Sequence, residues 1–106
     1  MSDAGDDDQA ASLREIASQS ENIWSWPGFE ETMHPLGYNL IDVYKAFKKG
    51  EIKVYDLERG SNSVYSFCVA YLFQGYKEAC HIRGWVDFST REIDLTDIFE
   101  STDMCL

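Results

Sequence analysis

The chain has 106 residues, of which 44% are hydrophobic and 14% aromatic, enough to fill the core of one domain. This composition excludes an intrinsically disordered protein, which would carry few aromatic residues. The formal net charge of −10 excludes ordinary nucleic-acid binding, because such proteins gain affinity by neutralising phosphates.

The negative charge is concentrated at the two ends of the sequence. Residues 1–44 carry nine acidic side chains against Arg14 alone, and residues 92–106 carry five acidic side chains without a base. The stretch between them has a balance of +3. Residues 1–9 (MSDAGDDDQ) contain almost no bulky apolar group, so we expect a disordered acidic leader before a single α+β domain over residues 10–106.

No window of the sequence reaches the roughly 18 apolar residues that a membrane helix needs, and the acidic start is unlike a signal peptide. We therefore expect a cytoplasmic protein that does not contact membranes. The cysteines Cys68, Cys80 and Cys105 form an odd and widely spaced set. This pattern favours reduced thiols over a disulfide scaffold.

The first half of the chain predicts two helices separated by a packed loop. Ser12 and Glu15 have capping-box spacing, which predicts that a first helix begins there. Asn39 and Gly50 bracket the second helix, whose apolar side chains repeat at helical spacing. Residues 23–37 contain both prolines and two tryptophans, and this composition predicts an irregular segment.

After the second helix the hydrophobic period changes to two, which predicts consecutive strands joined by tight turns. Residues 51–58, 63–73 and 77–88 alternate in this way, and residues 91–99 permit a last strand or a strand that runs into a helical turn. Gly84 is at a position typical of a bulge. The expected fold is α+β, with two N-terminal helices packed on an antiparallel meander sheet of three to four strands.

Three polar residues are the candidate catalytic group. His81, Arg83 and Asp87 alternate along the third predicted strand and should project from one face of it. A histidine can act as acid or base near neutral pH, and an arginine can hold an anionic oxygen. The alternative is a structural role, because any antiparallel sheet presents alternating polar residues to water.

The order of two helices followed by a meander sheet resembles in outline that of the RelE-type ribonuclease toxins. Those proteins place arginine, lysine, histidine and tyrosine residues on the sheet to cleave RNA. The resemblance implies a ribonuclease that uses His81 and Arg83 with Tyr65 or Tyr71. The chain departs from the family in its charge of −10, since such toxins are typically basic. A divergent RelE-like enzyme is therefore our alternative hypothesis.

No group of side chains has the spacing of a metal or cofactor site. Cys80 and His81 are adjacent, so on a strand they point to opposite faces. The run Asp6 to Asp8 lacks the alternation and the glycine of a calcium loop. Glycine-rich phosphate loops and paired-cysteine redox motifs do not occur in the sequence. We predict neither a metal nor a cofactor.

The acidic residues near the C-terminus predict an interaction surface. They recur every two or three residues and, with the leader, could present carboxylates in rows comparable to phosphates; they are Glu92, Asp94, Asp97, Glu100 and Asp103. Trp24, Trp26 and Phe29 are expected to cover one edge of the core or, alternatively, to form an exposed partner-binding patch. The leading hypothesis is a non-enzymatic protein-interaction module that inhibits a basic nucleic-acid-binding partner by charge mimicry, without binding nucleic acid itself.

Two further interpretations stay open. The acidity can serve solubility alone. The basic residues Lys45, Lys48 and Lys49 could also meet the acidic ends of a second copy of the chain, which would make the protein a homodimer.

Overall fold

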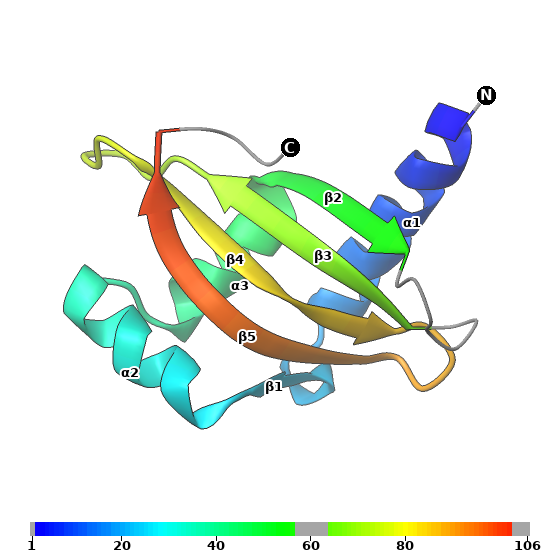
Figure 1. Cartoon of the computed structure of the whole chain (residues 1–106), viewed down its shortest axis with the longest axis horizontal. Coiled ribbons are helices and arrows are strands. Elements are labelled where there is room, and N and C mark those ends of the chain that lie inside the picture. Colours follow the sequence, from blue (N-terminus) through cyan, green and yellow to red (C-terminus); the bar gives the residue numbers. More distant parts are fainter. Residues whose placement is uncertain (1, 57–63, 103–106) are drawn as a thin grey trace.

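The computed structural model describes residues 2–56 and 64–102 of the chain. They form three α-helices, a 3-10 turn and one sheet of order β1-β5-β4-β3-β2 (Figure 1). The elements are α1 (Ser2–Ala17), η1 (Ser20–Asn22), β1 (Ile23–Ser25), α2 (Pro27–Leu36), α3 (Leu40–Lys49), β2 (Glu51–Asp56), β3 (Val64–Tyr71), β4 (Ala79–Asp87) and β5 (Glu92–Ser101). The expected α+β class is confirmed, with one helix and at least one strand more than predicted.

The extra elements occupy residues 23–37, where the prediction of a loop is wrong. Pro27 is the first residue of α2, a position that needs no backbone N–H and suits the fixed proline φ. Phe29 and Met33, one turn apart, are buried in the core. Gly37 ends the helix with a φ of 95°, which glycine adopts without strain. Pro27 and Gly37 therefore delimit a packed helix, while Gly28 and Pro35 lie inside it.

The other two helices differ in how well local signals predict them. α1 begins at Ser2, so Ser12 lies inside the helix and does not cap it, and α1 includes most of the segment expected as a leader. α3 has the predicted cap, because the Asp42 N–H donates to Asn39 and the Asn39 N–H donates to Asp42, each at 3.0 Å. In the described part of the chain, none of the helices is long and apolar enough to span a membrane.

The strands β2 to β5 form the expected antiparallel meander, and β1 pairs in parallel with β5 at the other edge. The expected bulge is present, because the register of β4 and β5 shifts between Arg83 and Gly84. Thr96 on β5 consequently has no residue of β4 directly opposite it. A Cβ atom at Gly84 would overlap the carbonyl oxygen of Asp94. Glycine at this position therefore lets β5 approach β4 closely beside the bulge.

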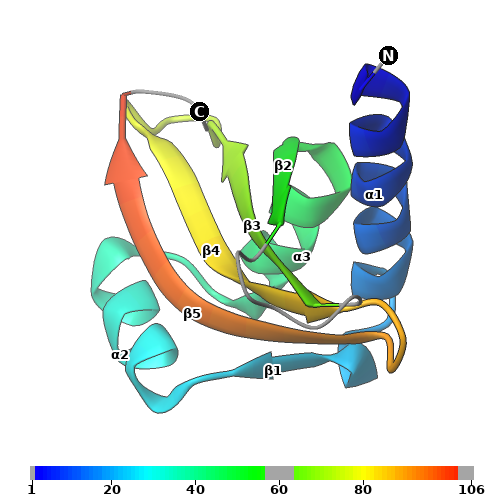
Figure 2. The same ribbon diagram turned by 45° about the vertical axis from the view of Figure 1, so that its right-hand side comes forward.

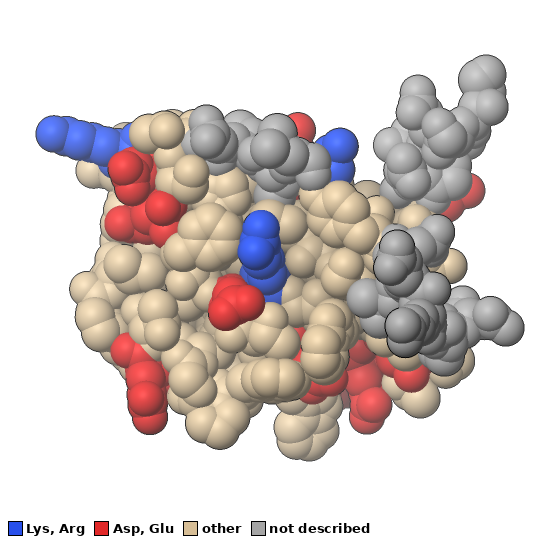
Figure 3. All heavy atoms as spheres, in the orientation of Figure 1, with Lys and Arg blue, Asp and Glu red and all other residues tan. Residues whose placement is uncertain are grey.

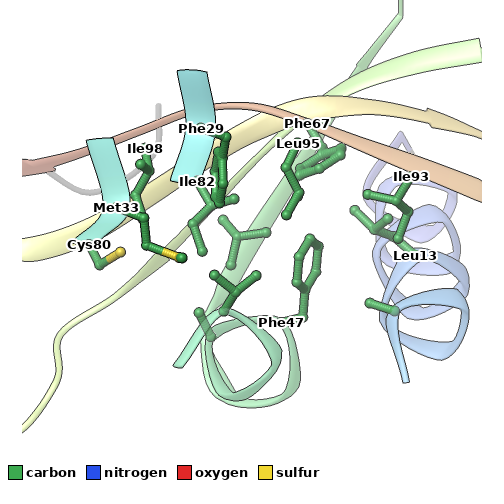
Figure 4. Close-up of a cluster of buried hydrophobic side chains, with 14 of the residues drawn as sticks. Leu13, Phe29, Met33, Phe47, Phe67, Cys80, Ile82, Ile93, Leu95 and Ile98 are labelled. Atoms are coloured by element: carbon green, nitrogen blue, oxygen red, sulfur yellow. The ribbon is translucent and has the colours of Figure 1, made fainter. Parts of the chain in front are cut away.

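All three helices pack on the same face of the sheet (Figures 1 and 2). Side chains from each helix point towards the strands and join one hydrophobic cluster (Figure 4), whose labelled members are Leu13, Phe29, Met33, Phe47, Phe67, Cys80, Ile82, Ile93, Leu95 and Ile98. The opposite side of the sheet, here called the outer face, is turned towards the viewer in Figure 1. Within the described residues, no helix covers it.

Candidate binding surface

A row of side chains crosses all five strands on the outer face. In the register of the sheet, Trp24 on β1 faces Asp94 on β5, which in turn faces Trp85 on β4. The row continues through Ser66 on β3 to Tyr55 on β2. Neighbouring strands lie about 4.8 Å apart, so the row is roughly 19 Å long. Residues far apart in the sequence thus form one continuous strip of surface.

All three tryptophans of the chain lie on this face. Trp24 is 58% exposed, Trp26 44% and Trp85 42%. The Trp26 and Trp85 rings meet edge to face with their centroids 5.4 Å apart, an attractive geometry for two aromatic rings. With Tyr55, which is 38% exposed, they make up four of the six large hydrophobic residues that are exposed in the described part of the chain.

The position of Trp24 and Trp26 decides between the two expectations for them. Phe29 is buried in the core next to this edge, whereas both tryptophans face solvent. The expectation that the tryptophans cover the core is therefore wrong. Both rings are exposed, as the alternative expected, and their role in binding a partner stays a prediction. Sequence reasoning did not add Trp85 to this patch, although its alternation with the buried Val86 already placed its indole on the outer face.

Three acidic residues of β5 share the outer face with the tryptophans. Glu92 and Asp94 alternate with buried strand residues in the ordinary way. The bulge at Thr96 then shifts the alternation by one residue, so Ile98 enters the core and Asp97 turns outward. The three carboxylates consequently follow one another along the strand beside the tryptophans.

Glu100 lies on the helix side of the sheet instead. The Tyr38 hydroxyl donates a hydrogen bond of 2.7 Å to its Oε2 atom. Burial, and after it this hydrogen bond, raises the pKa of Tyr38 far above its ordinary value. Burial and the nearby Glu100 charge also raise the pKa of the Cys80 thiol to about 12. Glu100 thus belongs to a packed cluster, and Asp103, the last predicted acidic contact, lies outside the described residues.

The three candidate catalytic residues share the outer face but do not converge. His81 is 3% exposed, and its ring stacks with that of Phe99 at a centroid distance of 5.0 Å. The Arg83 guanidinium carbon lies 5.2 Å from the centroid of the same Phe99 ring. Asp87 accepts hydrogen bonds from the backbone and hydroxyl of Ser89 in the following turn. At about 3.3 Å per residue, His81 and Asp87 are roughly 20 Å apart along β4, too far to act on one substrate atom.

The surroundings of His81 differ from those that the RelE-type resemblance implies. Tyr65 and Tyr71 pack against the core on the opposite side of the sheet. The Nδ1 atom of His81 has the Cys68 sulfur 3.9 Å away, and its Nε2 atom has no hydrogen-bond partner among the described residues. Cys80 faces the core, as its adjacency to His81 predicts. Within residues 2–56 and 64–102, no three histidine, cysteine or acidic side chains gather as metal ligands would.

On the helix side, a groove of about 480 Å³ lies between α1 and α3 and is lined by Arg14, Ala17, Ser18, Tyr44, Phe47 and Lys48. The guanidinium of Arg14 donates to the carbonyls of Phe47 at 2.8 Å and Lys48 at 2.7 Å. These are carbonyls at the C-terminal end of α3, which a cation stabilises. The basic group in this groove therefore has a structural role, whereas no such role explains the exposed tryptophans.

Comparison of the chain with protein-family models, with curated proteins and with solved structures found no match. The function proposed below is therefore based on the geometry of the outer face.

Proposed function

We propose that the protein is a non-enzymatic interaction module that binds a basic protein partner through the outer face of its sheet. The observation that carries this proposal is the exposure of all three tryptophans, together with Tyr55, on one face without a helix. Tryptophan and tyrosine are enriched among the residues that dominate protein–protein binding energies. An exposed cluster of such rings in a soluble domain indicates an interaction site.

The charges on this face indicate the chemistry of the partner. Five carboxylates and two basic side chains lie there within the described residues: Glu51, Asp87, Glu92, Asp94 and Asp97 against Lys53 and Arg83. A partner rich in lysine and arginine would be attracted to this face, and the net charge of −10 would speed the encounter. The same charge argues against direct binding of nucleic acid.

A narrower form of the proposal is that the partner itself binds nucleic acid and that the chain inhibits it by charge mimicry. The three carboxylates that follow one another along β5 support this form. The charged groups on this face stand in separate patches with uncharged surface between them (Figure 3). We therefore assign the main contact to the aromatic row and the choice of a basic partner to the carboxylates. Displacement of a labelled nucleic acid from the captured partner by the chain tests the narrower form.

The test is quantitative affinity capture from a lysate of the source organism, with partners identified by mass spectrometry. The bait proteins are the wild-type chain, a Trp24→Ala/Trp85→Ala variant and a control Ile41→Ala variant. Ile41 is a matched control because it is an exposed apolar residue on α3, away from the outer face. Loss of two aromatic contacts of the row should reduce capture at least about tenfold, since each such residue is expected to contribute more than about 1 kcal/mol.

The proposal expects a basic partner that the wild-type chain and the Ile41→Ala variant capture equally, and that high salt releases. Equal capture by all three baits would contradict the assignment of the surface. Partners that are acidic, or binding that does not respond to salt, would contradict the assignment of the partner's charge.

A further inference from the structure

We propose that Trp24, Asp94 and Trp85, supported by Trp26, form a binding site for one cationic side chain, an arginine or a lysine of the partner. This inference rests on the proposed function and names the chemical group that the surface recognises. It places the point of recognition at one end of the aromatic row, where β1, β5 and β4 lie side by side.

The register of the sheet sets a carboxylate between two indoles. Asp94 is the direct neighbour of Trp24 on one side and of Trp85 on the other. Side chains that face each other across paired strands have Cβ atoms about 5 Å apart, so all three lie within reach of one ligand group. The Trp26 and Trp85 rings meet edge to face, and this contact helps to fix the orientation of Trp85.

The Asp94 carboxylate is available to such a ligand. Within the described residues it forms no hydrogen bond or ion pair, although it is half-buried between large rings. Arg83, a basic residue on the adjacent β4 strand, faces Asp97 and places its guanidinium over the Phe99 ring. A partly desolvated carboxylate without a cation favours the entry of a positive group from outside the chain.

The indoles favour the same kind of ligand. A cation over an aromatic face gains about 0.5–1 kcal/mol at an exposed site, and tryptophan is the best of the three aromatic residues for this interaction. The outer face already contains one such contact, between Arg83 and Phe99. A guanidinium can in addition stack flat on an indole while its N–H groups reach the carboxylate. An uncharged apolar ligand would leave the Asp94 carboxylate buried without a partner, so the site discriminates against it.

Intrinsic fluorescence gives a direct test, because the three tryptophans of the chain all lie at this surface. Blocked pentapeptides with one central arginine, lysine or citrulline among glycines are titrated, at millimolar concentrations, into the wild-type chain. Citrulline has the shape of arginine without its charge. The expected result is a saturable change in fluorescence, with arginine and lysine bound roughly fivefold more tightly than citrulline.

Two variants and one control variant assign the effect to particular residues. Asp94→Asn should reduce the preference for arginine over citrulline to about twofold or less, since only the ring contacts remain. Glu31→Gln is the matched control, because this exposed carboxylate lies on α2, on the helix side of the sheet, and the variant should keep the preference. Trp24→Ala should weaken binding of the arginine peptide severalfold, and its exposed position makes a folding defect unexpected.

Equal affinities for arginine and citrulline, or an unchanged preference in Asp94→Asn, would overturn the cation site. Neither result would change the dependence on the tryptophans that is expected in the capture experiment, because a protein can still dock on the aromatic row through apolar contacts. Conversely, equal capture by the wild-type chain and the Trp24→Ala/Trp85→Ala variant would contradict the proposed function. The peptide titration would still test the cation site itself.

Discussion

The two faces of the same sheet use large side chains in opposite ways. On the helix side, residues such as Ile82, Val86 and Ile93 are completely buried and join side chains from all three helices. On the outer face, Trp24 and Trp85 keep about half of their surface in contact with solvent. Burial of apolar surface drives folding, so the first face accounts for stability. Rings on the second face bury less of their surface, so we expect them to contribute less to folding, and we propose that they bind a partner.

The largest expected effect comes from removing a ring on the helix side. Phe47 lies between α3 and the sheet, fully buried, with its ring 5.5 Å from that of Phe67. Phe47→Ala should lower the free energy of unfolding by about 3–5 kcal/mol, because it removes buried surface and leaves a cavity. Urea unfolding followed by circular dichroism measures this change. A loss below about 1 kcal/mol would show that the helix side is not the core.

A substitution at Gly84 tests the close approach of β4 and β5, on which both faces of the sheet depend. Gly84→Ala should destabilise the protein by about 3 kcal/mol, since the added Cβ would overlap the Asp94 carbonyl and separate β4 from β5. Gly28→Ala is the control, because a Cβ there meets no atom within 4 Å and alanine favours the helix. The same urea experiment should find the control as stable as the wild type or slightly more stable. Similar losses in both variants would argue against the close approach of the strands.

The buried thiol on the helix side predicts a pH dependence. Cys80 has its pKa raised from 9.0 to about 12 in the folded chain, so above pH 9 the unfolded state loses this proton first. The unfolded state then binds fewer protons than the folded state, and stability must fall as pH rises from about 9 towards 12. The slope approaches about 1.4 kcal/mol per pH unit for one group, and Tyr38, whose pKa is also raised, adds to it at the upper end.

Unfolding measured at pH 8, 9, 10 and 11 tests this expectation, with Cys80→Ala as the comparison. The variant should start less stable, because it leaves a small cavity, and should then lose less stability between pH 9 and 11 than the wild type. Parallel curves for the two proteins would contradict the raised pKa.

The smallest effect on folding is expected on the outer face. Trp24→Ala should change the free energy of unfolding by less than about 0.5–1 kcal/mol, because the ring is 58% exposed and belongs to a short edge strand. The measurement is the same urea unfolding as for Phe47→Ala. A loss of several kcal/mol would mean that Trp24 stabilises the fold and would remove the contrast between the two faces.

Local signals in the sequence predicted one part of the fold well. The cap at Asn39 and the end of α3 before Gly50 depend on neighbouring residues only. The alternation along β4 likewise predicted that His81, Arg83 and Asp87 share one face of the sheet. By contrast, β1 and α2 were missed because prolines were taken as breakers, although Pro27 sits where a helix accepts it.

The arrangement of the proposed binding surface could be predicted from the sequence only in part, since it depends on long-range pairing. The sequence singled out Trp24 and Asp94 separately, but only the parallel pairing of β1 with β5 makes them neighbours and brings Trp85 to the same place. The face of the sheet to which the acidic side chains of β5 point could likewise not be predicted from the sequence. The change of period between Leu95 and Ile98 predicts an irregularity, while the bulge itself decides which carboxylates face outward.

The exposure of the tryptophans on the outer face is tested most directly by the solvent accessibility of their three indole N–H groups in the intact chain. Their signals are resolved in a nitrogen–proton NMR spectrum and can be followed as a soluble paramagnetic reagent is added. All three signals should broaden, and the rings of Trp26 and Trp85 should show mutual proton contacts. Signals that stay sharp would mean that another part of the chain covers the tryptophans, and the outer face would then not be a free binding surface.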